Sequence, residues 1–196
     1  MTSACTHLSK EKKIQADSFA QLHRDTTLNC QQDDACALKS TLYDLADQAN
    51  AQSTTTVPKH AVVLLDHGQD SLVARLHLIY SAKHSIELQT FIFDQDDSGR
   101  LTLQALMEAA KRGVKVRVLL DQLYGLNDPN LQAYLAGYHT NFELRLYNPV
   151  FDEARTQQLE FAGAIFFTFK KLNQRMHSKL LLVDDKIAII GGRNIQ

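Results

Sequence analysis

Strand-like and helix-like segments alternate through the middle of this chain, and their order restricts the possible folds more than any other feature. The strand-like runs are rich in β-branched and aliphatic residues and end at turn residues, whereas the segments between them carry apolar residues at helical spacing. The predicted strands are SIELQTFIF (85–93), VKVRVLLD (114–121) and FELRLY (142–147), and the predicted helices are 70–83, 101–112 and 128–137. Such alternation forms βαβ units, so we predict an α/β fold with a mostly parallel sheet flanked by helices.

The loop DQDDSG follows the first of these strands and brings together Asp94, Asp96 and Asp97. It lacks the length and the remaining ligands of a calcium-binding EF-hand loop, so we predict a turn that caps the next helix. Binding sites of parallel sheets gather at the carboxyl ends of the strands. Gln89 and Asp121 are therefore candidates for a pocket wall, with roles in the core or at its rim as the alternative.

The segment MHSKLLLVDDKIAIIGGRN (176–194) contains two short apolar runs separated by DDK. Runs of this kind predict two buried strands joined by a tight hairpin. Alternate side chains of a strand share a face, so His177 and Lys179 point the same way. Asp184 is an odd number of positions away, and we expect it in the turn or in an orienting role.

The residues around this hairpin suit phosphoryl transfer. A neutral imidazole can attack phosphorus or carry a proton, while an ammonium group and amide donors stabilise charge on phosphate oxygens. Gly191 and Gly192 allow close approach of the backbone, and Arg193 and Asn194 add donors for an oxyanion. The alternative is an ordinary histidine at a strand start, followed by a lysine that extends to solvent.

The complete pattern, H-x-K-x4-D-x6-G-G-x-N, resembles the signature of the phospholipase D superfamily. The segments 85–121, ELRLYNP (143–149) and LNQRMHSK (172–179) resemble the first half of bacterial cardiolipin synthases of the C-type branch, over roughly residues 60–196. The resemblance implies an α/β/α lobe, the first of two, and a phosphohistidine intermediate formed without metal or cofactor. It assigns catalysis to His177, Lys179 and Asp184, and phosphate binding to Lys179, Asn194 and Arg193.

Only one H-x-K motif occurs in the 196 residues, whereas the resemblance implies two motifs in one active site. The favoured explanation is a truncated first lobe, whose second lobe belongs to the same protein, because the matching segments resemble two-motif lipid enzymes. The alternatives are a homodimeric phosphodiesterase or nuclease and a catalytically inactive fragment. We expect the isolated chain to be inactive and to self-associate.

Composition places limits on the partners and on the organisation of the chain. A formal net charge of -1 argues against a broadly basic surface for nucleic acid.

Residues 1–58 are polar and weakly patterned, with a predicted helix at 37–49, and we interpret them as an N-terminal extension of a lobe at 59–196. The run AVVLL (61–65) predicts the first strand of that lobe.

The expected partners are a phospholipid substrate and a bacterial membrane surface. No segment has the about 20 apolar residues that span a bilayer, so we expect a peripheral protein of the cell envelope, without an export signal in this sequence. FAGAIFFTF (161–169) is either a buried strand or a short interfacial patch. The basic residues that follow it suit a phosphate-rich ligand or an anionic membrane, with a solvated loop as the alternative; they are Lys170, Lys171, Arg175 and Lys179.

Three cysteines occur, none at zinc-ligand spacing. Cys30 and Cys36 form either a small disulfide loop or two free thiols. Cys5 lacks the preceding apolar region of a lipidated cysteine.

Overall fold

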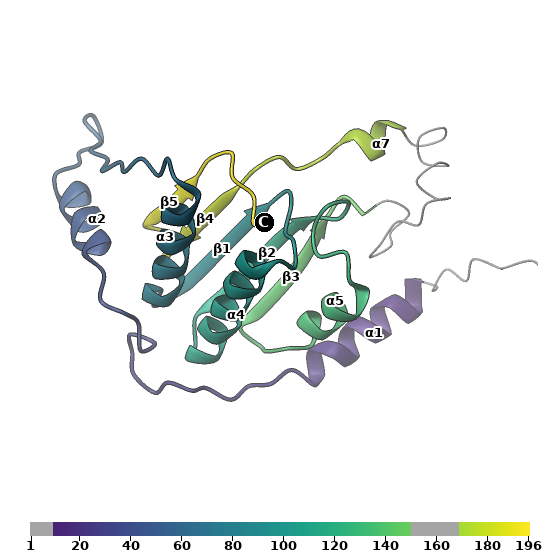
Figure 1. Ribbon diagram of the computed structural model, residues 1–196. Helices are drawn as coiled ribbons and strands as arrows, with labels where there is room; N and C mark the ends of the chain where they lie inside the picture. Colours follow the sequence, from purple (N-terminus) through teal and green to yellow (C-terminus); the bar gives the residue numbers. More distant parts are fainter. Residues whose placement is uncertain (1–9, 150–168) are drawn as a thin grey trace, which may run out of the picture.

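The computed structural model describes residues 10–149 and 169–196, and its centre is a five-stranded sheet (Figure 1). The strands are β1 (Ser85–Thr90), β2 (Lys115–Asp121), β3 (Phe142–Tyr147), β4 (Leu180–Val183) and β5 (Ile187–Ile190). They lie in the order β3–β2–β1–β4–β5, so the first strand of the chain is the central one. The α/β fold class is confirmed, and the strands predicted in the middle of the chain and at its hairpin are present.

The sheet is mixed: its first three strands are parallel, as the βαβ pattern predicts, and the predicted hairpin adds two antiparallel strands. β1 pairs in parallel with β2, and β2 with β3, because helices α4 (Asp97–Arg112) and α5 (Pro129–Ala136) carry the chain back between these strands. β4 runs antiparallel to β1, and β5 runs antiparallel to β4. The short DDK turn accounts for the pairing of β4 with β5, since a tight turn can join only antiparallel strands, whereas the direction of β4 beside β1 is set by the tertiary fold.

Helix α4 ends where the sequence predicts, at Arg112, and begins at Asp97, before the predicted start at 101. The Asp96 carboxylate accepts the amide of Gly99 at 2.8 Å, so DQDDSG is a helix cap. Gly113 ends the helix with a φ of +106°, a conformation that residues with a Cβ rarely adopt. Asp128 caps α5 by accepting the amide of Asn130 at 2.9 Å.

Helix α3 (Gly68–Ser81) and helix α4 pack side by side over one face of the sheet (Figure 1). Alternate strand residues point into this layer and form the core with apolar residues of the helices. The core includes Leu78 and Leu106 from the helices, and Ile86, Leu88, Val116, Val118, Leu120 and Leu181 from the strands. The intervening strand residues face the other way, where Arg117 pairs with Glu87 and Ile190 is 75 % exposed. No helix among residues 10–149 and 169–196 covers that second face. The described residues form two layers, where the resemblance implies three.

The segment before α3 crosses one side of the lobe and contains helices α1 (Lys10–Leu22) and α2 (Thr41–Ala51). Backbone hydrogen bonds attach it to the lobe, from Asn29 to the carbonyl of Lys111 at 2.8 Å and from Leu38 to the carbonyl of Tyr80 at 3.0 Å. The sequence did not predict α1, whose residues are largely polar. Helix α2 begins later than the predicted 37–49, because the Ser40 hydroxyl accepts the amide of Leu42 as its N-cap. The boundary between 58 and 59 stays a prediction.

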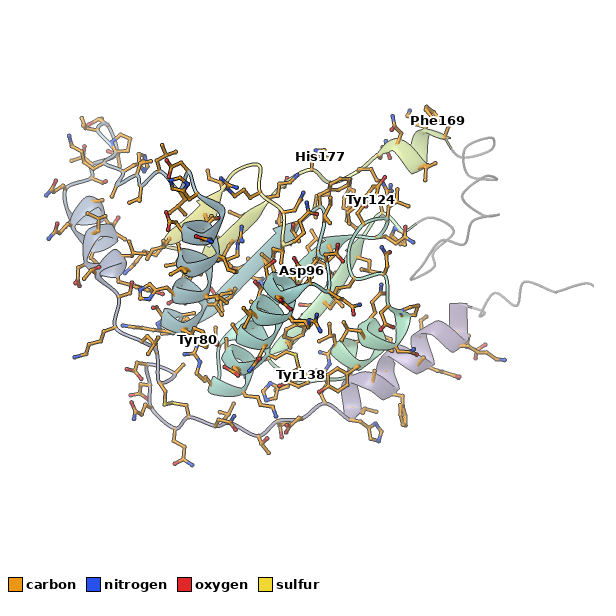
Figure 2. All side chains as sticks on the ribbon, viewed as in Figure 1. Tyr80, Asp96, Tyr124, Tyr138, Phe169 and His177 are labelled. Atoms are coloured by element: carbon orange, nitrogen blue, oxygen red, sulfur yellow. A yellow bond between two sulfur atoms is a disulfide. The ribbon has the colours of Figure 1, made fainter. Side chains whose placement is uncertain are left out.

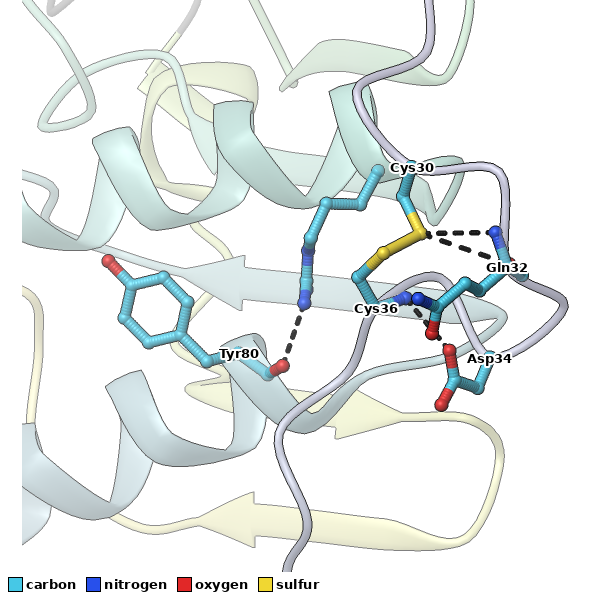
Figure 3. Close-up of a disulfide and its surroundings, with 6 residues drawn as sticks. Cys30, Gln32, Asp34, Cys36 and Tyr80 are labelled. Carbon is cyan, nitrogen blue, oxygen red and sulfur yellow. Dashed lines mark hydrogen bonds between the residues drawn. A yellow bond between two sulfur atoms is a disulfide. The ribbon is translucent and has the colours of Figure 1, made fainter.

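Cys30 and Cys36 form a disulfide, which decides between the two alternatives for these residues (Figure 3). The loop that it closes is stabilised further by Asp34, whose carboxylate accepts the amide of Cys36 at 3.0 Å. Near this loop, the guanidinium of Arg112 donates to the carbonyl of Tyr80 at 2.8 Å. The disulfide therefore lies where the N-terminal segment meets α3 and α4. Cys5 lies outside the described residues.

The run AVVLL is not a strand, so this prediction is wrong. Val62 and Leu64 are 87 % and 84 % exposed, and the run pairs with no strand among the described residues. An apolar run predicts a strand only where a neighbour can take its backbone hydrogen bonds. The run lies instead along a cavity next to α3 and β5.

Candidate functional site

The β4–β5 hairpin brings the two ends of the signature together. Leu180 pairs with Ile190, so the residues just before β4 lie next to those just after β5. His177 and Lys179 stand on the first side of this junction, and Gly191 to Asn194 stand on the second. Figure 2 shows His177 beyond the sheet, near Tyr124 from the loop after β2.

The ring of Phe91 contacts both candidate catalytic side chains. The imidazole of His177 lies 4.3 Å from it, centroid to centroid, and the Lys179 ammonium lies 5.3 Å from its centroid. Phe91 itself packs against Tyr124 at 4.8 Å. The two side chains thus lie on one side of the chain, as strand alternation predicts. Sequence reasoning missed Phe91 and Tyr124, because the predicted strand 85–93 includes Phe91 and no local pattern marks either ring as a contact of the signature.

The Lys179 ammonium donates to the carbonyl of His177 at 2.9 Å. This bond holds the charge beside the imidazole, where it can approach a phosphate oxygen.

Asn194 is held by the chain that follows β1. Its Oδ1 accepts the amide of Ile92 at 3.2 Å, and the amide of Ile195 donates to the carbonyl of Ile92 at 3.2 Å. The Nδ2 group of Asn194 has no partner among the described residues and is available as a donor. Arg193 is exposed and donates to the carbonyl of Asp66.

Asp184 stands at the other end of β4, in the hairpin turn, and does not contact His177 or Lys179. Its carboxylate accepts the amides of Lys83, His84 and Ser85 at 2.9, 2.8 and 2.8 Å. It also accepts the hydroxyl of Tyr43 at 2.5 Å. Burial raises the pKa of Asp184, but these hydrogen bonds outweigh it and leave the pKa below its ordinary value. Asp184 thus lies in the turn, as strand alternation predicts, and its carboxylate joins α2, β1 and the hairpin. Its catalytic role stays a prediction.

A buried ion pair holds the segment that leads to His177. Arg175 donates to the carboxylate of Asp121 at 3.1 Å, and the two side chains are 9 % and 0 % exposed. The amide of Met176 donates to the same carboxylate at 3.0 Å, and Arg175 also donates to the carbonyl of Asn148 at 3.0 Å. Asp121 therefore positions this segment and does not line the cavity that Gln89 lines. The acid at the end of β2 was visible in the sequence, but its partner was not.

The residues of the predicted basic cluster have different surroundings. Arg175 forms the buried ion pair with Asp121, Lys170 is exposed on helix α7 (Phe169–Asn173), and Lys179 contacts Phe91 at the site. The side chain of Lys171 lies outside the described part of the structure. FAGAIFFTF lies outside the described residues except for Phe169. Residues 10–149 and 169–196 contain no group of three or more His, Cys, Asp or Glu side chains that could hold a metal ion. None of the helices described is both long and apolar enough to cross a bilayer.

The arrangement combines an imidazole, an ammonium group and an amide donor at one end of a hairpin. Residues 76–196 match the family described as "Cardiolipin synthase, PLD-like domain". The chain belongs to this family of phospholipase D-like domains. The match covers the sheet and the whole signature from His177 to Asn194.

Curated relatives agree with the family assignment. The chain is 41 % identical to cardiolipin synthase C of Escherichia coli over 133 residues, which are 67 % of this chain and 26 % of that protein. It is 36 % identical to cardiolipin synthase B of Salmonella typhi over 135 residues, which are 68 % of this chain and 29 % of that protein. The chain thus spans about a quarter of the length of the curated relatives it matches.

Among solved structures, NucT from Helicobacter pylori aligns with a TM-score of 0.43 and 22 % identity, over 65 % of this chain and 69 % of that one.

Proposed function

We propose that this chain supplies one half of the active site of a cardiolipin synthase-like phosphatidyltransferase. The observation that carries the proposal is the common position of His177, Lys179 and Asn194 at one end of the β4–β5 hairpin, in a chain of this family. The substrate class is phospholipid, and the reaction moves a phosphatidyl group from one lipid onto the hydroxyl of another.

In the first step, the Nε2 atom of His177 attacks the phosphorus of the donor lipid. A bond from nitrogen to phosphorus forms, the bond from phosphorus to the headgroup oxygen breaks, and a second histidine protonates the leaving oxygen. In the second step, that histidine takes the proton of the acceptor hydroxyl, whose oxygen displaces His177 from phosphorus. Either histidine can take either role. Lys179 and Asn194 stabilise the phosphate oxygens, and Arg193 is a further donor.

The second histidine has to come from outside the motif described here, because the sequence holds one H-x-K. We propose a second lobe of the same protein as its source. The second candidate function is a homodimeric phosphodiesterase, in which a second copy of this chain provides the same residues; the single motif is the observation that favours it. On either reading, a monomer of the 196 residues has no measurable transferase activity and tends to self-associate. Light scattering after size-exclusion chromatography, run beside a lipid assay, tests this.

We propose peripheral binding to a membrane of the bacterial cell envelope. The disulfide between Cys30 and Cys36 supports an oxidising compartment, because such bonds persist outside the cytosol. Trapping of free thiols in intact cells, followed by fractionation, tests this placement. Reduced cysteines in a cytosolic fraction would contradict it.

The decisive assay for the reaction compares phosphatidylglycerol vesicles with DNA as substrates for the protein expressed from its complete gene. His177→Asn should reduce cardiolipin formation by several orders of magnitude, because it removes the nucleophile or the acid. His84→Asn is the matched control, since His84 is an exposed histidine at the opposite end of β1. DNA cleavage without lipid turnover would support the homodimeric phosphodiesterase and refute the transferase.

A further inference from the structure

A cavity of about 690 Å³ opens beside the site, between α3, the segment 60–65 and the turn after β5. Three cationic side chains line it: Lys179 from the signature, Arg193 from the turn and Arg75 from α3. No described Asp or Glu is among its lining residues. The cavity therefore carries uncompensated positive charge, which favours an anionic occupant.

Arg75 is the least expected member of this wall. It is one of the buried residues of α3 and is only 8 % exposed. It has no hydrogen-bond or ion-pair partner among the described residues, and the charged group that acts on it is another cation, Arg193. Burial and this neighbour lower the pKa of the guanidinium. A buried and unpaired charge is destabilising in general, so such groups are retained where a ligand completes them.

Further features of the wall fit a phosphate group. Ser71 lies one turn before Arg75 on α3 and is 4 % exposed, and its hydroxyl has no partner among residues 10–149 and 169–196. Gly191 and Gly192 leave open space, because nothing lies within 4 Å of a Cβ built on either. A guanidinium fork with a hydroxyl beside it is suited to the oxygens of a phosphate.

We propose that Arg75 and Arg193 form a second phosphate subsite, next to the one at His177 and Lys179, which holds the phosphate of the second phospholipid. This inference rests on the proposed function. The lipid that supplies the attacking hydroxyl carries a phosphodiester of its own, so the two-lipid reaction needs two anion sites close together. Apolar residues complete the wall beside the lipid's glycerol and chains; they include Leu65, Leu88 and Ile189.

The test uses the 196-residue chain and the variant Arg75→Met, which keeps a side chain of similar length without charge. Binding is measured by calorimetry with inorganic phosphate, and by flotation with phosphatidylcholine vesicles that either contain or lack phosphatidylglycerol. We expect Arg75→Met to weaken phosphate binding at least about tenfold, and to weaken binding to phosphatidylglycerol vesicles likewise. Arg100→Met is the matched control, because Arg100 is an exposed arginine on α4 that pairs with Asp97, and it should change neither.

Thermal unfolding in phosphate-free buffer separates this role from a structural one. Arg75→Met should be at least as stable as the wild type, because it removes a buried charge without a partner. A lower unfolding temperature with unchanged phosphate binding would show that Arg75 supports the fold, and would overturn the proposal. Phosphate binding that needs Arg75, together with binding to both kinds of vesicle that Arg75→Met leaves unchanged, would overturn the lipid as ligand. If vesicle binding depends on Arg75 but the complete protein makes no cardiolipin, the proposed function fails and the subsite stands.

Discussion

Replacing Asp184 by asparagine tests whether this carboxylate holds the fold together or takes part in the chemistry. Its Oδ1 accepts the amides of His84 and Ser85, and its Oδ2 accepts the amide of Lys83 and the hydroxyl of Tyr43. An asparagine keeps one oxygen but places an NH2 group where the other stood, opposite a backbone donor. The φ of +52° at this position does not complicate the comparison, since asparagine adopts that conformation as readily as aspartate.

The expected loss follows from the two bonds that the substitution breaks. A hydrogen bond to a charged group contributes about 1.5–3 kcal/mol. The exposed amide of Lys83 can turn to water and the Tyr43 hydroxyl can turn to accept from the new NH2 group, so we expect a loss of about 2–4 kcal/mol in the free energy of unfolding. That is a large share of the about 5–15 kcal/mol by which domains are stable.

Urea unfolding of the 196-residue chain, followed by circular dichroism, measures this loss. With a slope of about 2–3 kcal/mol per molar urea, the midpoint should fall by about 1 M. Asp185→Asn is the matched control, because Asp185 lies in the same turn with the same φ but is exposed and has no hydrogen bond among the described side chains. It should change the stability by less than about 0.5 kcal/mol. A wild-type midpoint for Asp184→Asn, together with lost phosphatidyl transfer, would refute the structural role.

Three further outcomes are expected. Arg175→Met should cost about 3–5 kcal/mol in thermal unfolding, because it leaves the buried partner carboxylate unpaired, whereas Arg145→Met on the exposed face should cost less than about 1 kcal/mol. Replacing Cys30 and Cys36 by serine should cost about 2 kcal/mol for so short a loop, and added reductant should affect the wild type alone. The folded-state pKa of Asp184 lies below its ordinary value of 3.8, so the ionised carboxylate contributes its full stability above pH 3.8. This stability is lost as the pH falls through the folded-state pKa, and Asp184→Asn should lack this loss in acid unfolding.

The sequence alone determined the elements whose causes are local. Strand FELRLY has the predicted bounds, and α4 is capped from the predicted turn DQDDSG and ends at the predicted Arg112. The hairpin at DDK and the common side of His177 and Lys179 also follow from spacing of a few residues. Turns, caps and side-chain alternation act within one or two turns of chain, so a single sequence contains what they need.

Only the tertiary structure decided the features that join distant segments. Asp184 bonds to Tyr43 across 141 positions and to Ser85 across 99, and Arg175 reaches Asp121 across 54. The same holds for the antiparallel pairing of β4 with β1 and for the unpaired AVVLL run, which had the composition of a strand but no neighbour to pair with. The local sequence around a charged or apolar side chain is the same whether that side chain contacts a core carboxylate, an edge strand or water. Only the assembled fold decides which of these partners it has.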